Sequence, residues 1–149
     1  VLPETITEAL QCFSDPSVEV VNVMSRFRTH ETFVNKNNVK VVVKQNNDAL
    51  YYSREPIPSL WRGLEGVPMY MQTGIIVFRR DTLLRFNTIE ESRLEQIESV
   101  DMNRILESGG QIRMLLTEAT TLGVDTPQEL KDAEKIMNGD PTLDQYLTQ

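Results

Sequence analysis

The chain has 149 residues and a mass of 17.1 kDa, with 40% apolar and 25% charged residues. This size and composition predict one globular domain or a large part of one, and they exclude a disordered chain, a collagen and a disulfide scaffold. The net charge is −7, because residues 63–149 carry fifteen acidic and eight basic side chains, whereas residues 1–62 carry seven of each. Since nucleic acid attracts a basic face, we expect no nucleic-acid partner.

The chain carries no segment typical of membranes or of secretion. Its longest apolar run, 75–78, is far shorter than the roughly 20 residues that a membrane helix needs, so we expect no membrane insertion. The first residues show no basic region followed by an apolar one, so we expect no secretory leader. The single cysteine, Cys12, cannot form an internal disulfide, which favours a reducing, cytoplasmic location. Because the chain begins with Val1 rather than methionine, we expect further residues upstream.

In chain order, the first half predicts a helix, a β-rich run and a β-hairpin, followed by a loop that contains proline and glycine. These elements cover, in the same order, residues 3–13, 18–24, 39–44 with 49–54, and 56–68. No helix or strand is predicted in the polar stretch 26–38.

The second half predicts a long strand, two helices, a short strand and a last helix. They cover residues 69–78, 82–86, 93–106, 112–116 and 126–137, and residues 141–149 follow as a tail. The long strand is apolar on both faces, which favours a buried, central position in a sheet. The alternation of strands and helices predicts an α/β fold with a mostly parallel or mixed sheet.

Asp101 is the first candidate for a site residue. If residues 93–106 form one helix, Asp101 lies in the middle of an apolar stripe that includes Ile97 and Ile105. A carboxylate on an apolar face needs either an ion pair, for example with Arg104, or a solvent-filled pocket. The first alternative makes Asp101 structural, and the second makes it a residue that faces a ligand.

Gln72 is the second candidate, because it interrupts the apolar strand 69–78. By alternation it shares one face with Tyr70, Gly74, Ile76 and Phe78. A buried amide must form hydrogen bonds, either with a neighbouring loop or with a ligand. Gly74 either marks a bulge or allows something to approach the backbone closely.

Asp125 is the candidate metal ligand. Thr126 as N-cap, Pro127 at the first helical position and Glu129 form a capping box for the last helix. Asp125 directly precedes this cap, where the helix dipole keeps a carboxylate ionised, and this suits a ligand of Mg²⁺. The alternative is a charge that only stabilises the start of the helix.

Other chemistry-bearing residues are few. Arg54, at the end of the strand 49–54, offers a guanidinium either to an anion or to the structure. His30 and Cys12 are each the only residue of their kind, so no Cys/His or Ser/His/Asp arrangement and no zinc cluster is predicted. The sequence contains no glycine-rich phosphate loop.

Read together, these segments resemble the second part of the CMP-Kdo synthetases (3-deoxy-manno-octulosonate cytidylyltransferases). The segments that carry the resemblance are 38–42, Ala49–Pro58, 94–99 and Gly123–Pro127, and 74–80 and 104–109 fit the same order and spacing. The resemblance covers about residues 1–139.

The resemblance implies a Rossmann-like α/β nucleotidyltransferase fold with a mixed sheet, from which the N-terminal nucleotide-binding strand and loop are missing. It implies that CTP is coupled to an acidic sugar, whose hydroxyl attacks the α-phosphorus of CTP, with Mg²⁺ as cofactor and pyrophosphate as product. By position, Asp125 matches a metal-binding aspartate of the family, and Arg54 lies in the strand that borders the substrate site. A homodimer is also implied, with its contact in residues 79–97.

Three departures from the family pattern concern the acceptor. Gln72 replaces a histidine, Ile76 replaces a sugar-contacting tyrosine, and Asp101-Met102 replace a glutamate-glutamine pair. These positions contact the sugar acid in the family, and pockets that bond a substrate group discriminate strongly on that group. The implied acceptor is therefore Kdo, another acid sugar or a small phosphonate.

The resemblance also implies how the chain is organised. Residues 1–139 correspond to the C-terminal part of a cytidylyltransferase domain, with the acid-sugar side and the dimer interface, and residues 140–149 form a tail. Without the phosphate-binding loop we expect this chain alone to be inactive. The alternative is a non-catalytic relative that acts as a dimerisation or sugar-binding module.

Overall fold

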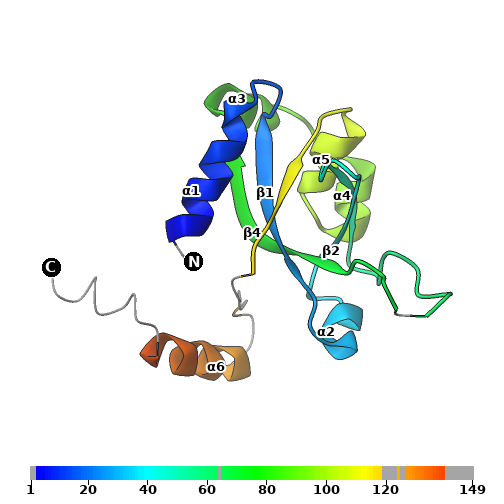
Figure 1. Cartoon of the computed structure of the whole chain (residues 1–149). Helices are drawn as coiled ribbons and strands as arrows, with labels where there is room; N and C mark the ends of the chain where they lie inside the picture. Colours follow the sequence, from blue (N-terminus) through cyan, green and yellow to red (C-terminus); the bar gives the residue numbers. More distant parts are fainter. Residues whose placement is uncertain (1–2, 64, 119–123, 125–126, 140–149) are drawn as a thin grey trace, which may run out of the picture. The chain divides into compact units, whose positions relative to one another are not determined.

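The computed structural model describes residues 3–63, 65–118, 124 and 127–139. The chain divides into two compact units, residues 1–119 and 120–149, and the second unit holds α6 (Pro127–Asn138) (Figure 1). The strands of the first unit are β1 (Val20–Arg26), β2 (Lys40–Val43), β3 (Ala49–Ser53), β4 (Tyr70–Phe78) and β5 (Arg113–Leu116). Its helices are α1 (Pro3–Gln11), a 3-10 turn (Cys12–Ser14), α2 (His30–Val34), α3 (Arg80–Phe86), α4 (Arg93–Glu98) and α5 (Met102–Glu107).

The five strands form one mixed sheet in the order β3-β2-β4-β1-β5. β1 and β5 are parallel and the other neighbours are antiparallel, which confirms the α/β fold with a mixed sheet and the predicted β2–β3 hairpin. β4 is the middle strand, as predicted, but its side chains are only half-buried, so the prediction of full burial is wrong. Among the helices of the first unit, α1 packs on β1, α5 packs on β3, and α4 packs on α5.

The two edge strands, β3 and β5, meet at one end because the sheet is curled. The backbone N–H of Ala49 donates to the carbonyl of Ile112 (2.9 Å), and that of Met114 donates to the carbonyl of Asn47 (2.8 Å). Nε of Arg113 donates to the buried carboxylate of Asp48 (2.8 Å), and this ion pair raises the pKa of Arg113. These contacts shield part of both sheet edges.

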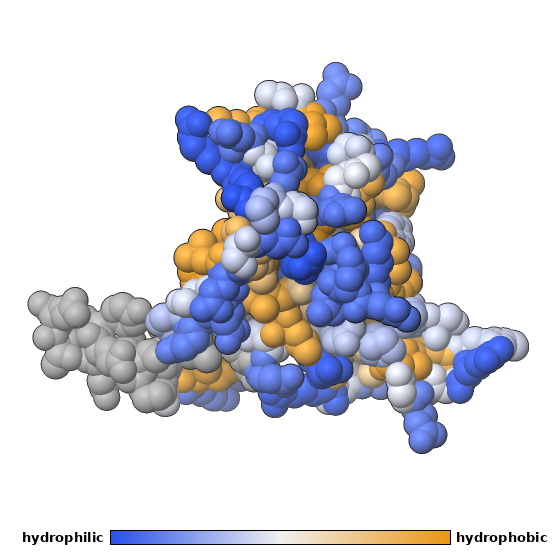
Figure 2. All heavy atoms as spheres, turned by 45° about the horizontal axis from the view of Figure 1, so that its top comes forward, coloured by the Kyte–Doolittle hydropathy of each residue, from blue (hydrophilic) through white to orange (hydrophobic). Residues whose placement is uncertain are grey.

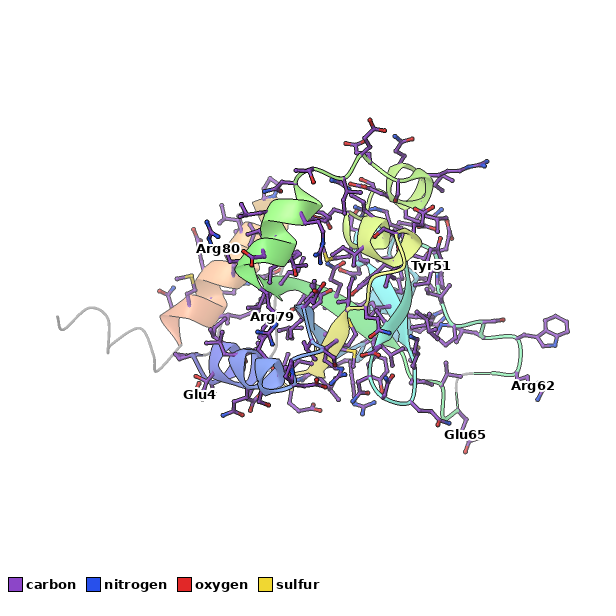
Figure 3. The ribbon with its side chains drawn as sticks, turned by 90° about the horizontal axis from the view of Figure 1, so that it is seen from above. Glu4, Tyr51, Arg62, Glu65, Arg79 and Arg80 are labelled. Atoms are coloured by element: carbon purple, nitrogen blue, oxygen red, sulfur yellow. The ribbon has the colours of Figure 1, made fainter. Side chains whose placement is uncertain are left out.

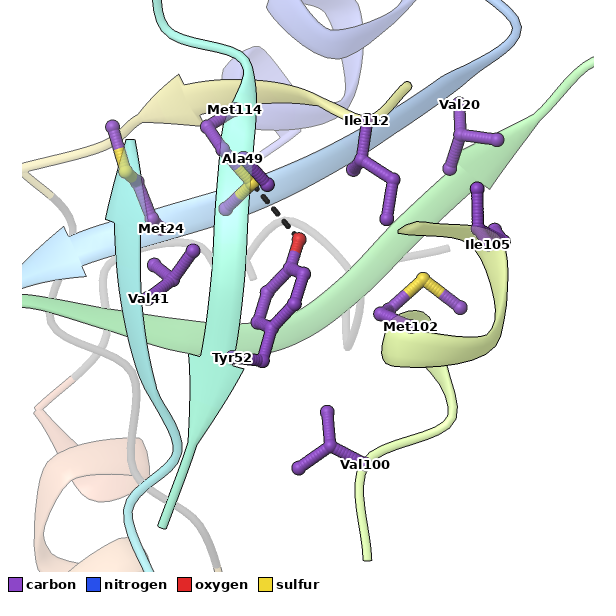
Figure 4. Close-up of a cluster of buried hydrophobic side chains, with 10 residues drawn as sticks. All are labelled: Val20, Met24, Val41, Ala49, Tyr52, Val100, Met102, Ile105, Ile112 and Met114. Carbon is purple, nitrogen blue, oxygen red and sulfur yellow. Dashed lines mark hydrogen bonds between the residues drawn. The ribbon is translucent and has the colours of Figure 1, made fainter. Parts of the chain in front are cut away.

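The sheet has an apolar core on each face, because neighbouring residues of a strand point to opposite sides. Val20 belongs to the larger cluster, which lies between the sheet and α5, whereas Val21 packs against α1. Figure 1 shows α1 on one side of the sheet and α4 and α5 on the other. The buried members of the larger cluster, drawn in Figure 4, are Val20, Met24, Val41, Ala49, Tyr52, Val100, Met102, Ile105, Ile112 and Met114.

The short helix α2 lies in the polar stretch for which no element was predicted. Thr29 caps it, since its hydroxyl accepts from the backbone N–H of Thr32 (3.2 Å). Phe33 is fully buried and packs edge-on against Phe27, with ring centroids 5.3 Å apart. A helix of five residues with one buried side chain shows no repeating apolar period, which is why the sequence pattern missed it.

The segment between β3 and β4 is long and extends from the sheet. Figure 3 shows Arg62 and Glu65 at its outer end, and the side chain of Trp61 is 90% exposed. Other large apolar side chains also reach the surface, including Leu83 and Leu84 of α3 and Ile97 of α4. Figure 2 shows apolar side chains among the hydrophilic ones on one face of the molecule.

Candidate functional site

The segment 93–106 was predicted to be one helix, but it forms two helices, α4 and α5, joined at residues 99–101. We call these three residues the elbow. Ser92 and Glu95 form a capping box at the start of α4. Ser99 ends α4 in the left-handed conformation, with φ 53° and ψ 48°. Because a residue in this conformation cannot continue a right-handed helix, α5 starts on a new axis after the elbow.

The elbow changes the environment of Asp101. The predicted apolar stripe does not exist, since Ile97 is 65% exposed, and Val100, Met102 and Ile105 are the residues buried in the core. Asp101 lies directly before α5 and is exposed, so the prediction that it sits on an apolar face is wrong. Its carboxylate therefore faces solvent in the free protein and is accessible to a ligand.

Arg54 and Glu98 hold each other's backbone at the elbow. Nε of Arg54 donates to the carbonyl of Glu98 (2.8 Å), and its terminal nitrogens donate to the carbonyls of Ser99 and Lys36 (3.1 Å each). In return, the carboxylate of Glu98 accepts from the backbone N–H of Arg54 (2.8 Å). Three of the five N–H donors of the guanidinium thus bind carbonyl oxygens, so Arg54 has a structural role at the elbow. Its contact with an anion stays a prediction.

The carboxylate of Glu98 has two further donors on β3. It accepts from the hydroxyl of Tyr51 (2.6 Å) and from that of Ser53 (3.0 Å). Burial alone would raise the pKa of Glu98, but these hydrogen bonds and the one from Arg54 hold the pKa below its ordinary value of 4.5. Burial and the bond to Glu98 raise the pKa of Tyr51 to about 12, so the hydroxyl stays a donor at neutral pH.

Replacing Glu98 by glutamine is expected to lower the free energy of unfolding by about 2 kcal/mol, because three donors lose a charged acceptor. A carboxyl whose pKa is depressed in the folded state contributes stability above the ordinary pKa and loses it as the pH falls through the depressed value. The difference between wild type and E98Q in urea unfolding should therefore be full at pH 7 and shrink below pH 4.5. The exposed Glu90→Gln variant is the control, and an equal loss in both variants would contradict this role.

Glu95 and Arg104 form a nearly buried ion pair that joins α4 to α5. The guanidinium binds both carboxylate oxygens, and the distance from Nε to Oε2 is 2.6 Å. Arg104 also donates to the carbonyl of Ile89 (3.0 Å) and stacks on the ring of Phe86, 4.6 Å from its centroid. The hydrogen bonds from Arg104 lower the pKa of Glu95, so the pair stays charged. The sequence had offered Arg104 as a partner for Asp101, whereas its partner is Glu95.

An open groove of about 470 Å³ lies beside the elbow. Its lining residues are Glu91, Glu95, Gln96, Ser99, Val100 and Asp101. The carboxylates of Glu91 and Asp101 and the amide of Gln96 are exposed there, while that of Glu95 is occupied by Arg104. Exposed carboxylates and amides of this kind accept hydrogen bonds from hydroxyl groups.

Gln72 and Ile76 flank a bulge in β4. Of the two explanations offered for Gly74, the bulge is therefore confirmed. Gly74 has φ +77° and is exposed. Gln72 pairs with Met24 of β1 and Ile76 pairs with Asn22, and the register shifts between the two pairs. Gln72 is half-buried, and its side-chain amide forms no hydrogen bond with the residues that the structure describes, so the predicted bond to a neighbouring loop is not found there.

The structure places the five predicted substrate residues on the same side of the sheet. Ile76 packs against the larger core cluster, and Gln72 shares its face through its pairing with Met24. Asp101 lines the groove and Arg54 fixes the elbow. Met102 is 1% exposed, so it supports the elbow from inside the core and does not line the groove. Asp125, the predicted metal ligand, lies outside the described residues.

Lys40 and Asn22 are among the buried polar residues that the sequence analysis missed. Lys40 is fully buried in β2, and its Nζ donates to the carbonyls of Asn35 (2.7 Å), Asn38 (2.9 Å) and Arg54 (2.7 Å). Burial lowers the pKa of Lys40. Asn22 is fully buried in β1. The available signal was a polar residue inside a run of valines, which is unusual for lysine or asparagine.

The described residues offer no ready metal centre. Within residues 3–63, 65–118, 124 and 127–139, no three His, Cys, Asp or Glu side chains are grouped so that they could hold a metal ion. In the same part of the chain, no helix combines the length and the apolar character needed to cross a membrane.

Comparison with known proteins finds cytidylyltransferases among the relatives of this chain. The profile of a family described as cytidylyltransferase matches residues 1–118. A 3-deoxy-manno-octulosonate cytidylyltransferase of Pelobacter propionicus is 35% identical over 146 residues, which cover 91% of this chain and 57% of that protein. Its counterpart in Bacteroides thetaiotaomicron is 33% identical, with coverages of 91% and 57%.

A solved structure of CMP:2-keto-3-deoxy-manno-octonic acid synthetase complexed with CTP matches the fold with a TM-score of 0.85 at 34% identity. The match covers 93% of this chain and 57% of that one. This chain thus spans the C-terminal part, somewhat more than half, of the relatives that it matches. The resemblance inferred from the sequence motifs is confirmed.

Proposed function

This chain belongs to the cytidylyltransferase family, and from that premise we propose that the whole protein couples CTP to an acidic sugar, Kdo or a related acid. The products would be a CMP-sugar and pyrophosphate. The observation that carries the proposal is the structural match, with a TM-score of 0.85, to a synthetase complexed with CTP. The names of the similar proteins support the same reaction.

In this proposal, the side of the sheet that carries the elbow binds the acceptor. The unbonded amide of Gln72 can donate to an acceptor carboxylate or hydroxyl, and the carboxylate of Asp101 can accept from a sugar hydroxyl. Ile76 offers only apolar contact, and the exposed carboxylates of the groove repel a second negative charge. The acceptor therefore presents its acid group toward β4 and its hydroxyls toward the elbow, which leaves Kdo, another acid sugar or a small phosphonate as candidates.

The cofactor in this proposal is Mg²⁺, which neutralises charge on the reacting phosphates when it is bound. Asp125 is the residue of this chain that would hold it, on the basis of its position before Pro127, where α6 begins. The described residues alone do not form a metal centre.

We also propose a homodimer with its contact in residues 79–97. Leu83 and Leu84 of α3 are 42% and 51% exposed, and Ile97 of α4 is 65% exposed. Exposed apolar side chains gathered on one stretch are typical of a protein interface.

Because the chain has only one cysteine, we place the protein in the cytoplasm.

The test is a pyrophosphate-release assay of the whole protein with CTP, Mg²⁺ and Kdo, and with other acid sugars and 2-carbon phosphonates as alternative acceptors. We expect turnover that depends on CTP, on Mg²⁺ and on one acid acceptor, with other nucleoside triphosphates used far less. Absence of turnover with every acceptor, together with Kdo binding in calorimetry, would favour a sugar-binding module instead. Sedimentation equilibrium of the same preparation tests the dimer, and a monomer at micromolar concentration would contradict it.

A further inference from the structure

The bulge in β4 sets the distance between Gln72 and Ile76. In a regular strand, residues four apart are separated by about 13 Å. Here their partners on β1, Met24 and Asn22, are only two residues apart, which corresponds to about 7 Å. The three residues between them, 73–75, stand opposite Val23 alone. The bulge thus brings two candidate acceptor residues close together on the same face.

At the bulge, the regular backbone hydrogen bonding between β1 and β4 is interrupted. Two side chains donate hydrogen bonds to backbone carbonyls there. Nδ2 of Asn22 donates to the carbonyl of Ile75 (2.9 Å), and the hydroxyl of Thr73 donates to the carbonyl of Val23 (3.0 Å). Asn22 is fully buried, and its neighbours Val21 and Val23 are fully buried too. A buried amide in this position needs partners for all its polar atoms.

Tyr52 supplies the second partner of Asn22. The hydroxyl of Tyr52 donates to Oδ1 of Asn22 (3.0 Å). It also lies 3.0 Å from the sulfur of Met114, a contact that Figure 4 shows as a dashed line. Tyr52 is fully buried, and burial raises its pKa, so the hydroxyl keeps its proton and donates. The orientation of the amide is therefore fixed from β3.

The same chain of contacts reaches α5. The buried side chain of Asn103 accepts from the backbone N–H of Tyr52 (3.2 Å) and donates to its carbonyl (3.0 Å). Asn103 follows Asp101 and Met102 directly in sequence. One line of fully buried polar groups from β1, β3 and α5 therefore joins the bulge to the elbow.

From this arrangement we infer that Asn22 and Tyr52 are positioning residues for the acceptor side of the site. They hold the bulge that places Gln72 and Ile76, and they tie its position to that of Asp101. Bulges commonly re-aim side chains beside active sites, and the buried polar line gives this one a fixed geometry. The inference rests on the proposed function, since it assigns Gln72 and Ile76 to the acceptor.

The test compares Tyr52→Phe and Asn22→Val with the control Val41→Ala, which removes buried apolar atoms opposite Tyr52 in the same core but deletes no side-chain hydrogen bond of the polar line. Tyr52→Phe keeps the ring and removes only the hydroxyl. The first measurement is amide hydrogen exchange in this chain at Gly74, Ile75 and Ile76. We expect exchange there to rise about tenfold more in the two variants than in the control.

The second measurement is the KM for Kdo and for CTP, made on the whole protein. In Tyr52→Phe we expect the KM for Kdo to rise about fivefold or more while the KM for CTP stays within twofold, because only the acceptor side is displaced. Unchanged exchange at the bulge, or an unchanged KM for Kdo in a variant whose bulge exchanges faster, overturns the inference. Wild-type protein without turnover overturns the proposed function, and the inference with it, whatever the exchange measurement gives.

Discussion

Replacement of Arg104 by methionine is expected to lower the free energy of unfolding by about 3 kcal/mol or more at pH 7. The side chains of Glu95 and Arg104 are only 11% and 14% exposed, so the variant leaves a carboxylate nearly buried without its partner. It also removes the contacts of the guanidinium with Phe86 and with the carbonyl of Ile89. Urea unfolding at constant temperature measures the difference.

The pH dependence separates the charge from the packing in this prediction. Arg104 lowers the pKa of Glu95, so the pair stabilises the fold above the ordinary value of 4.5, and this contribution disappears as the pH falls through the depressed pKa. The difference between wild type and R104M should therefore be largest at neutral pH and shrink in acid.

Two further variants control for the loss of a basic residue. Arg93→Met removes an exposed arginine of α4 and should change stability by less than about 0.5 kcal/mol. The double variant Glu95→Leu/Arg104→Met should recover part of the loss, because apolar pairs replace buried ion pairs at little cost, although it also removes the bond from the backbone N–H of Ser92 to Glu95. A loss below about 1 kcal/mol in R104M would show that water reaches the pair and solvates the free carboxylate.

Replacement of Asp125 by asparagine is expected to lower the turnover of the whole protein by about 100-fold or more, within the proposed function. Asparagine has nearly the volume of aspartate but no charge, so it cannot supply the carboxylate that the proposed Mg²⁺ ligand requires. Stability should change by less than about 1 kcal/mol, the usual worth of one charge near a helix N-terminus. The measurements are pyrophosphate release and thermal unfolding.

A matched variant and a second readout make this prediction specific. Asp132→Asn makes the same chemical change within α6 and should leave turnover within twofold of wild type. Calorimetric titration of Mg²⁺ into the protein with CTP should show weaker binding in D125N. Turnover and Mg²⁺ affinity equal to wild type would remove Asp125 from the metal site and leave it as a helix-terminal charge.

Local patterns in the sequence were sufficient for the fold class and for most element positions. The valine-rich runs, the turn residues between β2 and β3, and the proline at the start of α6 each act within a few residues, so their consequences can be read from the sequence. The side of β4 that carries Gln72 and Ile76 also follows from alternation alone, because the bulge adds an even number of residues. The family resemblance came from the same short segments.

Contacts between distant segments decided the rest. The helix pattern over 93–106 is continuous in sequence, but Ser99 leaves the helix where Arg54, 45 residues earlier, binds the carbonyl of Ser99. Because of this break, Asp101 is exposed and Arg104 pairs with Glu95. The helical period of the sequence indicates neither the exposure nor the ion pair. A left-handed residue other than glycine is unfavourable on its own, and the bond from Arg54 to the carbonyl of Ser99 adds to the local helix-end bonds to the carbonyl of Glu95 that stabilise it.

The amino-acid sequence was sufficient to identify this chain as a segment of an α/β cytidylyltransferase and to predict most of its strands and helices. The spacing of Gln72 and Ile76, the exposure of Asp101 and the contacts of Arg54 depend on the folded structure. The two sets differ in the range of the interactions: backbone propensity and apolar period act over a few residues. Buried hydrogen bonds and ion pairs join residues far apart in the chain, and their geometry exists only once the sheet and the elbow have formed.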